Sequence, residues 1–307
     1  MSVHNSVHWP DQSKSAFGHE ILRASRAFEG SNLFDDDGLA HLLDAYPRQS
    51  LDIWTFGSNR EGENPALRGR APKLSGKDIM EAVKHGRIWL NLRRAQLELD
   101  ALKPIADEIF GSLEAATGQR TRKRDMGLLI SSPNVHVHYH LDIPMVALFQ
   151  LRGKKRIWLY PTDEAYAPPS YIEDIVHMIR EEDLPYRHAF DRGARVFDLL
   201  PGMAVTWPQL APHRIQNANC VNVSLSCEFM TMKSWVNANA IYTNAFLRKN
   251  LRLTPKAVNG LGPATLGKAA FARVHKACTR RGPRTAPTPV SFELDMNSEA
   301  CTRLLYA

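Results

Sequence analysis

The sequence predicts a mainly β core of the jelly-roll or barrel type, with helical additions at both ends. Eight short β-rich runs follow one another between residues 126 and 232, separated by Gly, Pro and Asn turns. Closely spaced strands of this kind favour a barrel or sandwich over alternating β-α units. Residues 1–125 and 233–307 have a helical texture instead. At 307 residues and 44% hydrophobic, the chain is long enough to form a substantial core.

The N-terminal region, residues 1–125, is expected to be helical and to cover the barrel. Apolar residues recur at helical spacing in "GLAHLLDAYP", and Pro47 ends the run. Ser75 and Asp78 form a capping-box pattern that opens a second helix, with Gly86 as its stop. A third helix is expected to begin near Pro104. The run "IWLNLRR" is a candidate piece of the cavity wall, although its apolar residues also suit the core.

The core, residues 126–232, contains the eight expected strands, and the chain is expected to become helical again over residues 233–307. The strand runs are "GLLIS", "VHVHYHLD", "MVALFQLRG", "RIWLYP", "RVFDLLPG", "AVTWP", "HRIQN" and "VNVSLSCEF". Beyond the C-terminal helices, "RRGPRTAPTPV" is expected to be an exposed linker or arm.

The net charge of +7 is concentrated in one segment. Residues 248–284 contain ten Lys and Arg and no Asp or Glu, so the rest of the chain carries a net charge of −3. Ten positive charges favour salt-sensitive nucleic-acid binding, but the segment contains few aromatic residues for base stacking. We therefore do not expect a nucleic-acid partner, and the C-terminal helical region is the candidate contact of a homodimer.

The sequence shows no membrane span and no disulfide framework. It contains no apolar run of about 18 residues, and its N-terminus lacks the basic start and apolar stretch of a secretory signal. The four cysteines form no C-x-x-C pair, which suits reduced thiols. We expect a cytoplasmic protein that does not enter a membrane.

The stretch "NVHVHYHLDIP" places histidines and an acid at every second position. On a regular strand, His136, His138, His140 and Asp142 would share one face, and the apolar residues between them would take the other. In "VNVSLSCEF" the polar residues alternate in the same way, namely Asn222, Ser224, Ser226 and Glu228. A polar barrel interior is costly unless its groups are paired or bind something. Two such strands predict a polar ligand or a metal inside the barrel.

A His-x-Asp pair with one later histidine is the pattern of the two-histidine, one-carboxylate iron site. His140 and Asp142 form the pair, and His213 is the candidate third ligand. The alternative is an ordinary polar strand, because a lone His-x-Asp occurs by chance. The region around His213 decides between them.

The stretch "PGMAVTWPQLAPHRIQN" resembles the second conserved motif of the cupin superfamily. Gly202, Pro208, His213 and Asn217 match the motif, and Leu210 stands where glycine is usual. "HLD" followed by "FQLRGKKRIWLYP" is similar to the jumonji (JmjC) branch, in which H-x-D precedes a strand with a conserved pattern. The matching residues are Gln150, Gly153, Lys155, Trp158, Leu159 and Pro161. The resemblance covers roughly residues 126–231.

This resemblance implies a double-stranded β-helix and an Fe(II)- and 2-oxoglutarate-dependent oxygenase. His140, Asp142 and His213 would be the iron ligands and the catalytic centre. Lys155 would bind the distal carboxylate of 2-oxoglutarate, with Ser224 or Ser226 completing that site. Asn217 would lie in the substrate pocket. From its position on the strand, His138 either lines the same pocket or hydrogen-bonds within the barrel, and His136 is expected to be structural. Hydroxylation of a peptide side chain or a small molecule with O2 is the implied activity.

Two other functions remain compatible with the sequence. The first is a cupin-type metal protein that does not use 2-oxoglutarate, such as an isomerase, another dioxygenase or a small-molecule binder. It would keep His140, Asp142 and His213 and give Lys155 no ligand. The second is a non-catalytic binding protein that acts through its basic C-terminal arm.

Overall fold

Two β-sheets form the centre of the protein in the computed structural model, which describes residues 7–28, 32–55, 66–71, 73–258, 260–279 and 288–305. The larger sheet has the strand order β1 (Leu22–Ala27), β10 (Gly202–Thr206), β7 (Met145–Arg152), β12 (Asn222–Met230), β5 (Arg122–Ser131), β4 (Ile88–Leu92), β2 (Leu51–Thr55), β3 (Leu67–Arg70), β13 (Val290–Leu294) and β14 (Thr302–Leu304). The smaller has the order β6 (His136–His140), β11 (His213–Asn217), β8 (Lys155–Leu159) and β9 (Arg195–Leu199). All pairings are antiparallel except that of β13 with β3.

The two sheets enclose an apolar layer between them. Val146 and Leu148 of β7 pack with Ile157 and Leu159 of β8, and Trp207 joins the same cluster. Each fully buried aliphatic side chain of this kind contributes about 1.5–3 kcal/mol to folding. The predicted β core with helical additions is therefore confirmed, and all eight predicted runs are strands.

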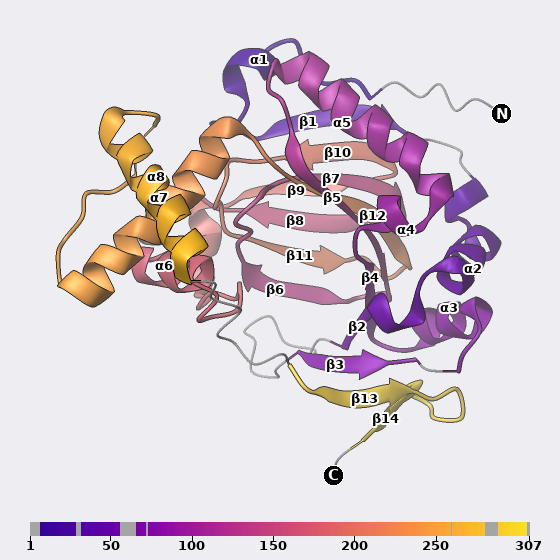
Figure 1. The fold of residues 1–307 in the computed structure, drawn as a ribbon. Helices are drawn as coiled ribbons and strands as arrows, with labels where there is room; N and C mark the ends of the chain where they lie inside the picture. The colour runs from indigo at the N-terminus through magenta and orange to yellow at the C-terminus, as the bar shows by residue number, and fades with distance from the viewer. Residues whose placement is uncertain are drawn as a thin grey trace.

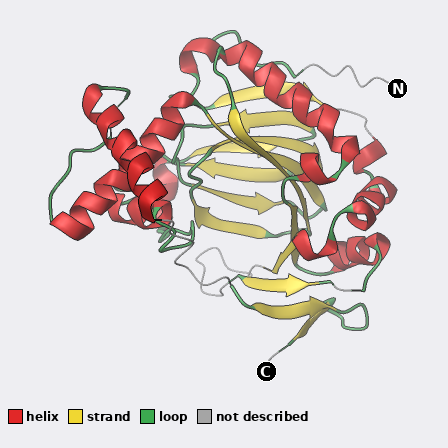
Figure 2. Cartoon of the chain, viewed as in Figure 1, coloured by secondary structure: helices red, strands yellow, loops and turns green. Residues whose placement is uncertain are grey.

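Helices cover the outside of the sheets, as Figures 1 and 2 show. On the N-terminal side they are α1 (Ser13–Ala16), η1 (Asn32–Phe34), α2 (Asp36–Ala45), η2 (Arg48–Ser50), α3 (Gly76–His85), α4 (Ala95–Glu98), η3 (Asp100–Leu102) and α5 (Lys103–Thr117). The others are α6 (Pro169–Val176), η4 (His188–Gly193), α7 (Met232–Leu251) and α8 (Pro263–Thr279). Phe110 of α5 meets Phe229 of β12 edge to face at 6.2 Å, so α5 packs against the larger sheet.

Local capping explains where the long helices begin. Ser75 and Asp78 make the predicted reciprocal capping box at the start of α3, and Thr231 and Ser234 make a second one at the start of α7. These bonds satisfy backbone N–H groups that lack a helical partner. Pro104 lies in the first turn of α5, as predicted.

The terminal regions contain strands that the sequence did not predict. Residues 1–125 supply β1 to β4, and the C-terminal region supplies β13 and β14, which join the larger sheet through β3. The description of these regions as helices and loops is corrected here. Runs as short as "LDIWT" and "IWLNL" cannot be assigned to strand or buried helix by periodicity alone. The boundaries at residues 126 and 232 stay a prediction.

Two turns have the left-handed backbone that the motifs require. Gly153, between β7 and β8, has φ +76°, and a Cβ there would lie 2.2 Å from the carbonyl oxygen of Val221. Leu210 has φ +66° at the motif position where glycine is usual. A leucine in this conformation is strained. The turn nevertheless keeps the left-handed backbone of the motif, with leucine in place of the usual glycine.

Two sequence predictions concern the rest of the chain. Residues 280–287 of the predicted C-terminal arm lie outside the described residues. Within the described ranges, no helix has both the length and the apolar character that a bilayer span requires.

Gly153→Ala is expected to destabilise the protein by about 2–4 kcal/mol, because a positive φ and a backbone clash act together. Chemical denaturation measures the change. Gly111→Ala is the control, since Gly111 lies inside α5 and a Cβ there meets nothing within 4 Å. It should stabilise by about 0.5–1 kcal/mol. Equal stability of Gly153→Ala and the wild type would contradict the turn geometry.

Candidate active site

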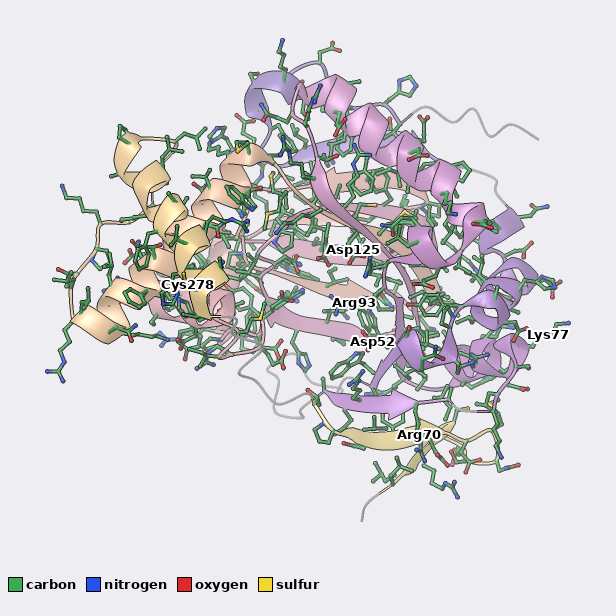
Figure 3. The ribbon with its side chains drawn as sticks, viewed as in Figure 1. Asp52, Arg70, Lys77, Arg93, Asp125 and Cys278 are labelled. Carbon is green, nitrogen blue, oxygen red and sulfur yellow. The ribbon has the colours of Figure 1, made fainter. Side chains whose placement is uncertain are left out.

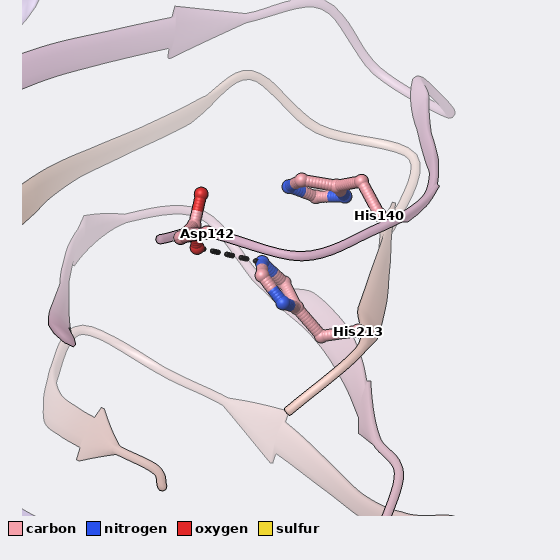
Figure 4. A group of neighbouring side chains, drawn as sticks. All are labelled: His140, Asp142 and His213. Atoms are coloured by element: carbon pink, nitrogen blue, oxygen red, sulfur yellow. Dashed lines mark ion pairs between the residues drawn. The ribbon is translucent and has the colours of Figure 1, made fainter. Parts of the chain in front are cut away.

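Three potential metal ligands converge at one end of the smaller sheet. His140 ends β6, Asp142 follows two residues later, and His213 begins β11, directly opposite His140 in the antiparallel register. One ligand atom from each side chain lies within 4.8 Å of the other two. Nε2 of His213 is 3.4 Å from Oδ2 of Asp142, and Figure 4 shows the three side chains meeting.

Both imidazole rings are oriented by backbone carbonyls. Nδ1 of His140 donates to the carbonyl of His138 at 2.8 Å, and Nδ1 of His213 donates to that of Ala211 at 3.3 Å. A carbonyl can only accept, so Nδ1 carries the proton in each ring and Nε2 has the free lone pair. Outer contacts of this kind are typical of metal-binding histidines.

Burial shifts the pKa of His213 and of Asp142. It lowers the pKa of His213 well below its usual value, together with the nearby His140, so the ring is neutral at pH 7. Burial also raises the pKa of the Asp142 carboxyl, against the attraction of His140. Neutral imidazole is the metal-binding form, and a cation would stabilise a carboxylate held in this buried position. The donor set therefore fits a two-histidine, one-carboxylate metal site.

A β-bulge breaks the predicted alternation of the histidines. His140 pairs with His213, but Val137 pairs with Ile215, so three steps on β6 match two on β11. Val137 therefore takes the same face as His140, and His136, opposite Gln216, takes the other. The prediction that the three histidines share one face is therefore wrong for His136, whereas His138 and His140 both line the cavity. Bulges re-aim side chains in this way and occur often beside active sites.

Lys155 begins β8 and lies opposite Asn217 of β11, at the far end of this strand pair from His213. It is only 4% exposed, and within the described part of the chain its ammonium has no hydrogen-bond or ion-pair partner. Burial lowers its pKa to about 7. A buried cation without an anion is costly, and this side chain lines the same cavity as the three candidate ligands.

The predicted accessory residues differ in their placement. Ser226, Asn217 and His138 line the cavity. Asn217 is buried and its Nδ2 donates to Ser131 Oγ at 2.8 Å. Ser224 does not line the cavity, because its hydroxyl is fully buried and donates to Gln150 Oε1 at 2.7 Å. The structure thus brings together every predicted site residue except Ser224.

The cavity, of about 650 Å³, extends well beyond the metal ligands. It is also lined by residues that the sequence did not identify as site residues, from four separate segments: Asp52, Trp54, Trp89, Asn91, Glu182 and Glu228. Arg93 lines the cavity too, and a terminal nitrogen of its guanidinium lies 3.9 Å from Oδ2 of Asp52. Both residues are labelled in Figure 3.

Trp89, Asn91 and Arg93 of the run "IWLNLRR" line the cavity. The other apolar residues of the run, Ile88, Leu90 and Leu92, belong to the hydrophobic core. In the sequence, the alternation of polar and apolar residues along β12 places Glu228 on the polar face of that strand.

Several carboxyl groups lie close together in this cavity. Burial, with Asp142 and Glu228 nearby, raises the pKa of Glu182 to about 8. Burial and Asp142 likewise raise the pKa of Glu228 to about 7, and Arg93 opposes both shifts. The cavity therefore contains a buried lysine, Lys155, and a group of crowded acids around Asp142 and Arg93.

The two sheets form a β barrel with helical additions, and the resemblance predicted from the motifs is confirmed at the level of the fold. The crystal structure of Escherichia coli ribosomal oxygenase YcfD superposes with a TM-score of 0.50 and 12% identity, covering 96% of this chain and 76% of that one. Another X-ray structure of E. coli YcfD has a TM-score of 0.49 and 14% identity, covering 89% and 70%.

A third structure, YcfD with cobalt and 2-oxoglutarate, has a TM-score of 0.45 and 12% identity, covering 90% of this chain and 70% of that one. At such identities the likeness shows the fold alone. No family model matches the chain, and no curated protein matches it in sequence.

The pKa of Lys155 makes stability depend on pH. Its folded-state value of about 7 lies below the ordinary 10.5, so between these values the unfolded chain binds more protons and stability rises with pH. Lys155→Met should therefore stabilise the protein at pH 7, by up to about 1.4 kcal/mol per unit of that difference. The gain should vanish near pH 10.5.

Denaturation of wild type and variant at several pH values measures this gain. Lys154→Met is the control, because the Lys154 side chain is 48% exposed; its effect should stay within about 0.5 kcal/mol at every pH. A gain for Lys155→Met that is the same at pH 7 and pH 10 would show that the ammonium is not desolvated.

Proposed function

We propose that the protein is an Fe(II)- and 2-oxoglutarate-dependent oxygenase that hydroxylates a peptide side chain or a small molecule. One observation carries the proposal: two imidazoles and a carboxylate meet in a cavity that also contains a buried lysine with no partner among the described residues. The first three groups fit a ferrous ion with open positions. The lysine fits an anion in the same cavity. The oxygenase named for the E. coli structure of the same fold is consistent with this activity.

His140, Asp142 and His213 would hold the metal through Nε2, a carboxylate oxygen and Nε2. When bound, the iron and 2-oxoglutarate supply the oxidising power that side chains lack. The chain's own contribution is ligation, orientation and exclusion of water. Trp207 and Ile215, both buried, form part of the apolar lining beside the ligands.

Lys155 would bind the distal carboxylate of 2-oxoglutarate. It lies four residues before Leu159, the residue opposite His213, which is about 13 Å along the strand at about 3.3 Å per residue. A lysine side chain and a short dicarboxylate together can span this distance. Ser226 remains the candidate for a second contact, whereas the Ser224 hydroxyl is engaged by Gln150.

The substrate would bind in the same cavity. The Oδ1 atom of Asn91 is buried and has no hydrogen-bond partner among the described residues, and Asn91 lines the cavity. An orphaned buried acceptor is costly, and the Asn91 side chain that carries it is a candidate contact of the substrate. His138, on the same cavity, is a further candidate contact. The homodimer contact through the C-terminal helices and the cytoplasmic location stay predictions.

The metal site is tested by cobalt titration, followed through the visible absorption of the bound ion. His140→Ala and His213→Ala should each weaken Co(II) binding by about 100-fold or more, since each removes a ligand. His138→Ala is the control: His140 is oriented by the backbone carbonyl of His138, not by its ring. The control should bind within about threefold of wild type. Normal binding by both ligand variants would refute the site.

The co-substrate is tested by succinate formation from 2-oxoglutarate with Fe(II) and ascorbate, without an added substrate. Lys155→Met should raise the KM for 2-oxoglutarate by about 100-fold, because a buried charge pair is lost. Lys154→Met should leave it unchanged, since Lys154 is exposed and pairs with Asp198. A wild type that makes no succinate yet binds Co(II) through these ligands would favour the cupin-type metal protein that does not use 2-oxoglutarate.

A further inference from the structure

The chain between β8 and β9, residues 160–194, returns to the barrel and forms part of the cavity rim. The amide of Leu184 donates to the carbonyl of Tyr139 at 3.0 Å, and that of Leu141 donates to the carbonyl of Glu182 at 3.3 Å. The backbone of Asp183 forms an isolated antiparallel β-bridge with that of His140. Residues 181–186, all of which line the cavity, are called the cavity wall below.

Arg214 lies behind this wall, on the opposite face of β11 from His213. Its side chain is almost fully buried, at 4% exposure. The guanidinium carbon lies 3.6 Å from the centre of the Trp158 ring, a cation–π contact. Nε donates to the hydroxyl of Tyr160 at 2.8 Å, and a terminal nitrogen donates to Asp191 at 2.7 Å. The guanidinium is thus held by an aromatic face, a hydroxyl and a carboxylate.

These partners come from both ends of the 160–194 segment. Tyr160 begins it, Asp191 lies near its end, and the Tyr160 hydroxyl also donates to Asp191 at 2.6 Å. Burial opposes ionisation of Asp191, but hydrogen bonds from Tyr160 and Arg214 hold its pKa below the usual value. Arg214 therefore joins both ends of the segment to the strand that carries His213.

Aromatic contacts connect this junction to the cavity wall. The Tyr139 ring lies 4.9 Å from that of Tyr160 and 5.7 Å from that of Tyr186, the last residue of the wall. The middle of the segment is anchored separately, because Glu173 of α6 pairs with Arg248 of α7 at 3.1 Å. Loss of the Arg214 junction should therefore loosen the wall while α6 stays attached to α7.

We propose that Arg214 is a positioning residue for the substrate, which holds the cavity wall 181–186 against the strands of the candidate metal ligands. The effect of Arg214 on substrate turnover rests on the proposed function, whereas its role in holding the cavity wall does not. A planar guanidinium is suited to this junction because it can stack and make directed hydrogen bonds at the same time. Lysine can supply only the charge.

Hydrogen exchange at single amides tests the role of Arg214. Arg214→Met should speed exchange of the Leu184 amide by about tenfold or more, through local opening. Exchange of the His177 amide, which donates to the backbone carbonyl of Glu173 at the C-terminal end of α6, should be unchanged. Arg214→Lys should restore part of the protection. Unchanged exchange at Leu184, or equal loss of protection at His177, would overturn the proposal.

Arg156→Met is the matched control. Arg156 also lies over the Trp158 ring, at 6.0 Å, and pairs with Asp198, but its side chain is 51% exposed. It should leave exchange at Leu184 unchanged. If Arg214→Met does not fold, Asp191→Asn carries the test, since it weakens the same junction and should also speed exchange at Leu184. No change in that variant would overturn the proposal.

Cobalt affinity separates this inference from the proposed function. Because the Arg214 side chain points away from the metal ligands, Arg214→Met should bind Co(II) within about threefold of wild type. A wild type that does not bind Co(II) would contradict the proposed function while leaving the exchange result valid. Strong loss of Co(II) binding in Arg214→Met alone would show that Arg214 supports the ligands and not the wall.

Discussion

The antiparallel pairing of β6 with β11 is the contact on which the candidate site depends. It places His140 directly opposite His213, although 72 positions of sequence separate them. Each ring is then held by a backbone carbonyl close to it in sequence, so the two Nε2 atoms are presented with little remaining freedom. The bulge beside this pair breaks the alternation along β6 and lets Val137 join the apolar lining. Backbone pairing thus sets the relative position of the candidate metal ligands.

Strands of the larger sheet face the hydrophobic core on one side and the cavity on the other. On β12, Leu225 and Phe229 belong to the hydrophobic core, whereas Ser226 and Glu228 line the cavity. The strands β2 and β4 extend this arrangement outward and add tryptophan, asparagine and acidic side chains to the rim. A polar strand face is tolerated here because the cavity gives those groups access to solvent or ligand.

The charges inside the cavity are not balanced by the protein itself. Lys155 is buried without an anionic partner among the described residues, while burial and the neighbouring Asp142 raise the pKa of both Glu182 and Glu228. Such an arrangement costs folding free energy, and binding sites are where proteins commonly accept that cost. A metal ion beside the ligands and an anion beside Lys155 would relieve both imbalances, which is why the electrostatics support the same function as the geometry.

The sequence by itself determined the local features: the eight core strands, the helix starts at Ser75 and Pro104, and the His-x-Asp spacing. These follow from periodicity, capping and motif spacing, which act over a few residues. The distant histidine, His213, was found through the resemblance of its motif to the cupin pattern. Only the tertiary structure decided that β1 to β4, β13 and β14 extend the sheet, that Ser224 is engaged by Gln150, and that the cavity wall stands beside His140. Those features depend on pairing between segments far apart in the chain, and neither local propensity nor alternation specifies the partner or the register of a strand.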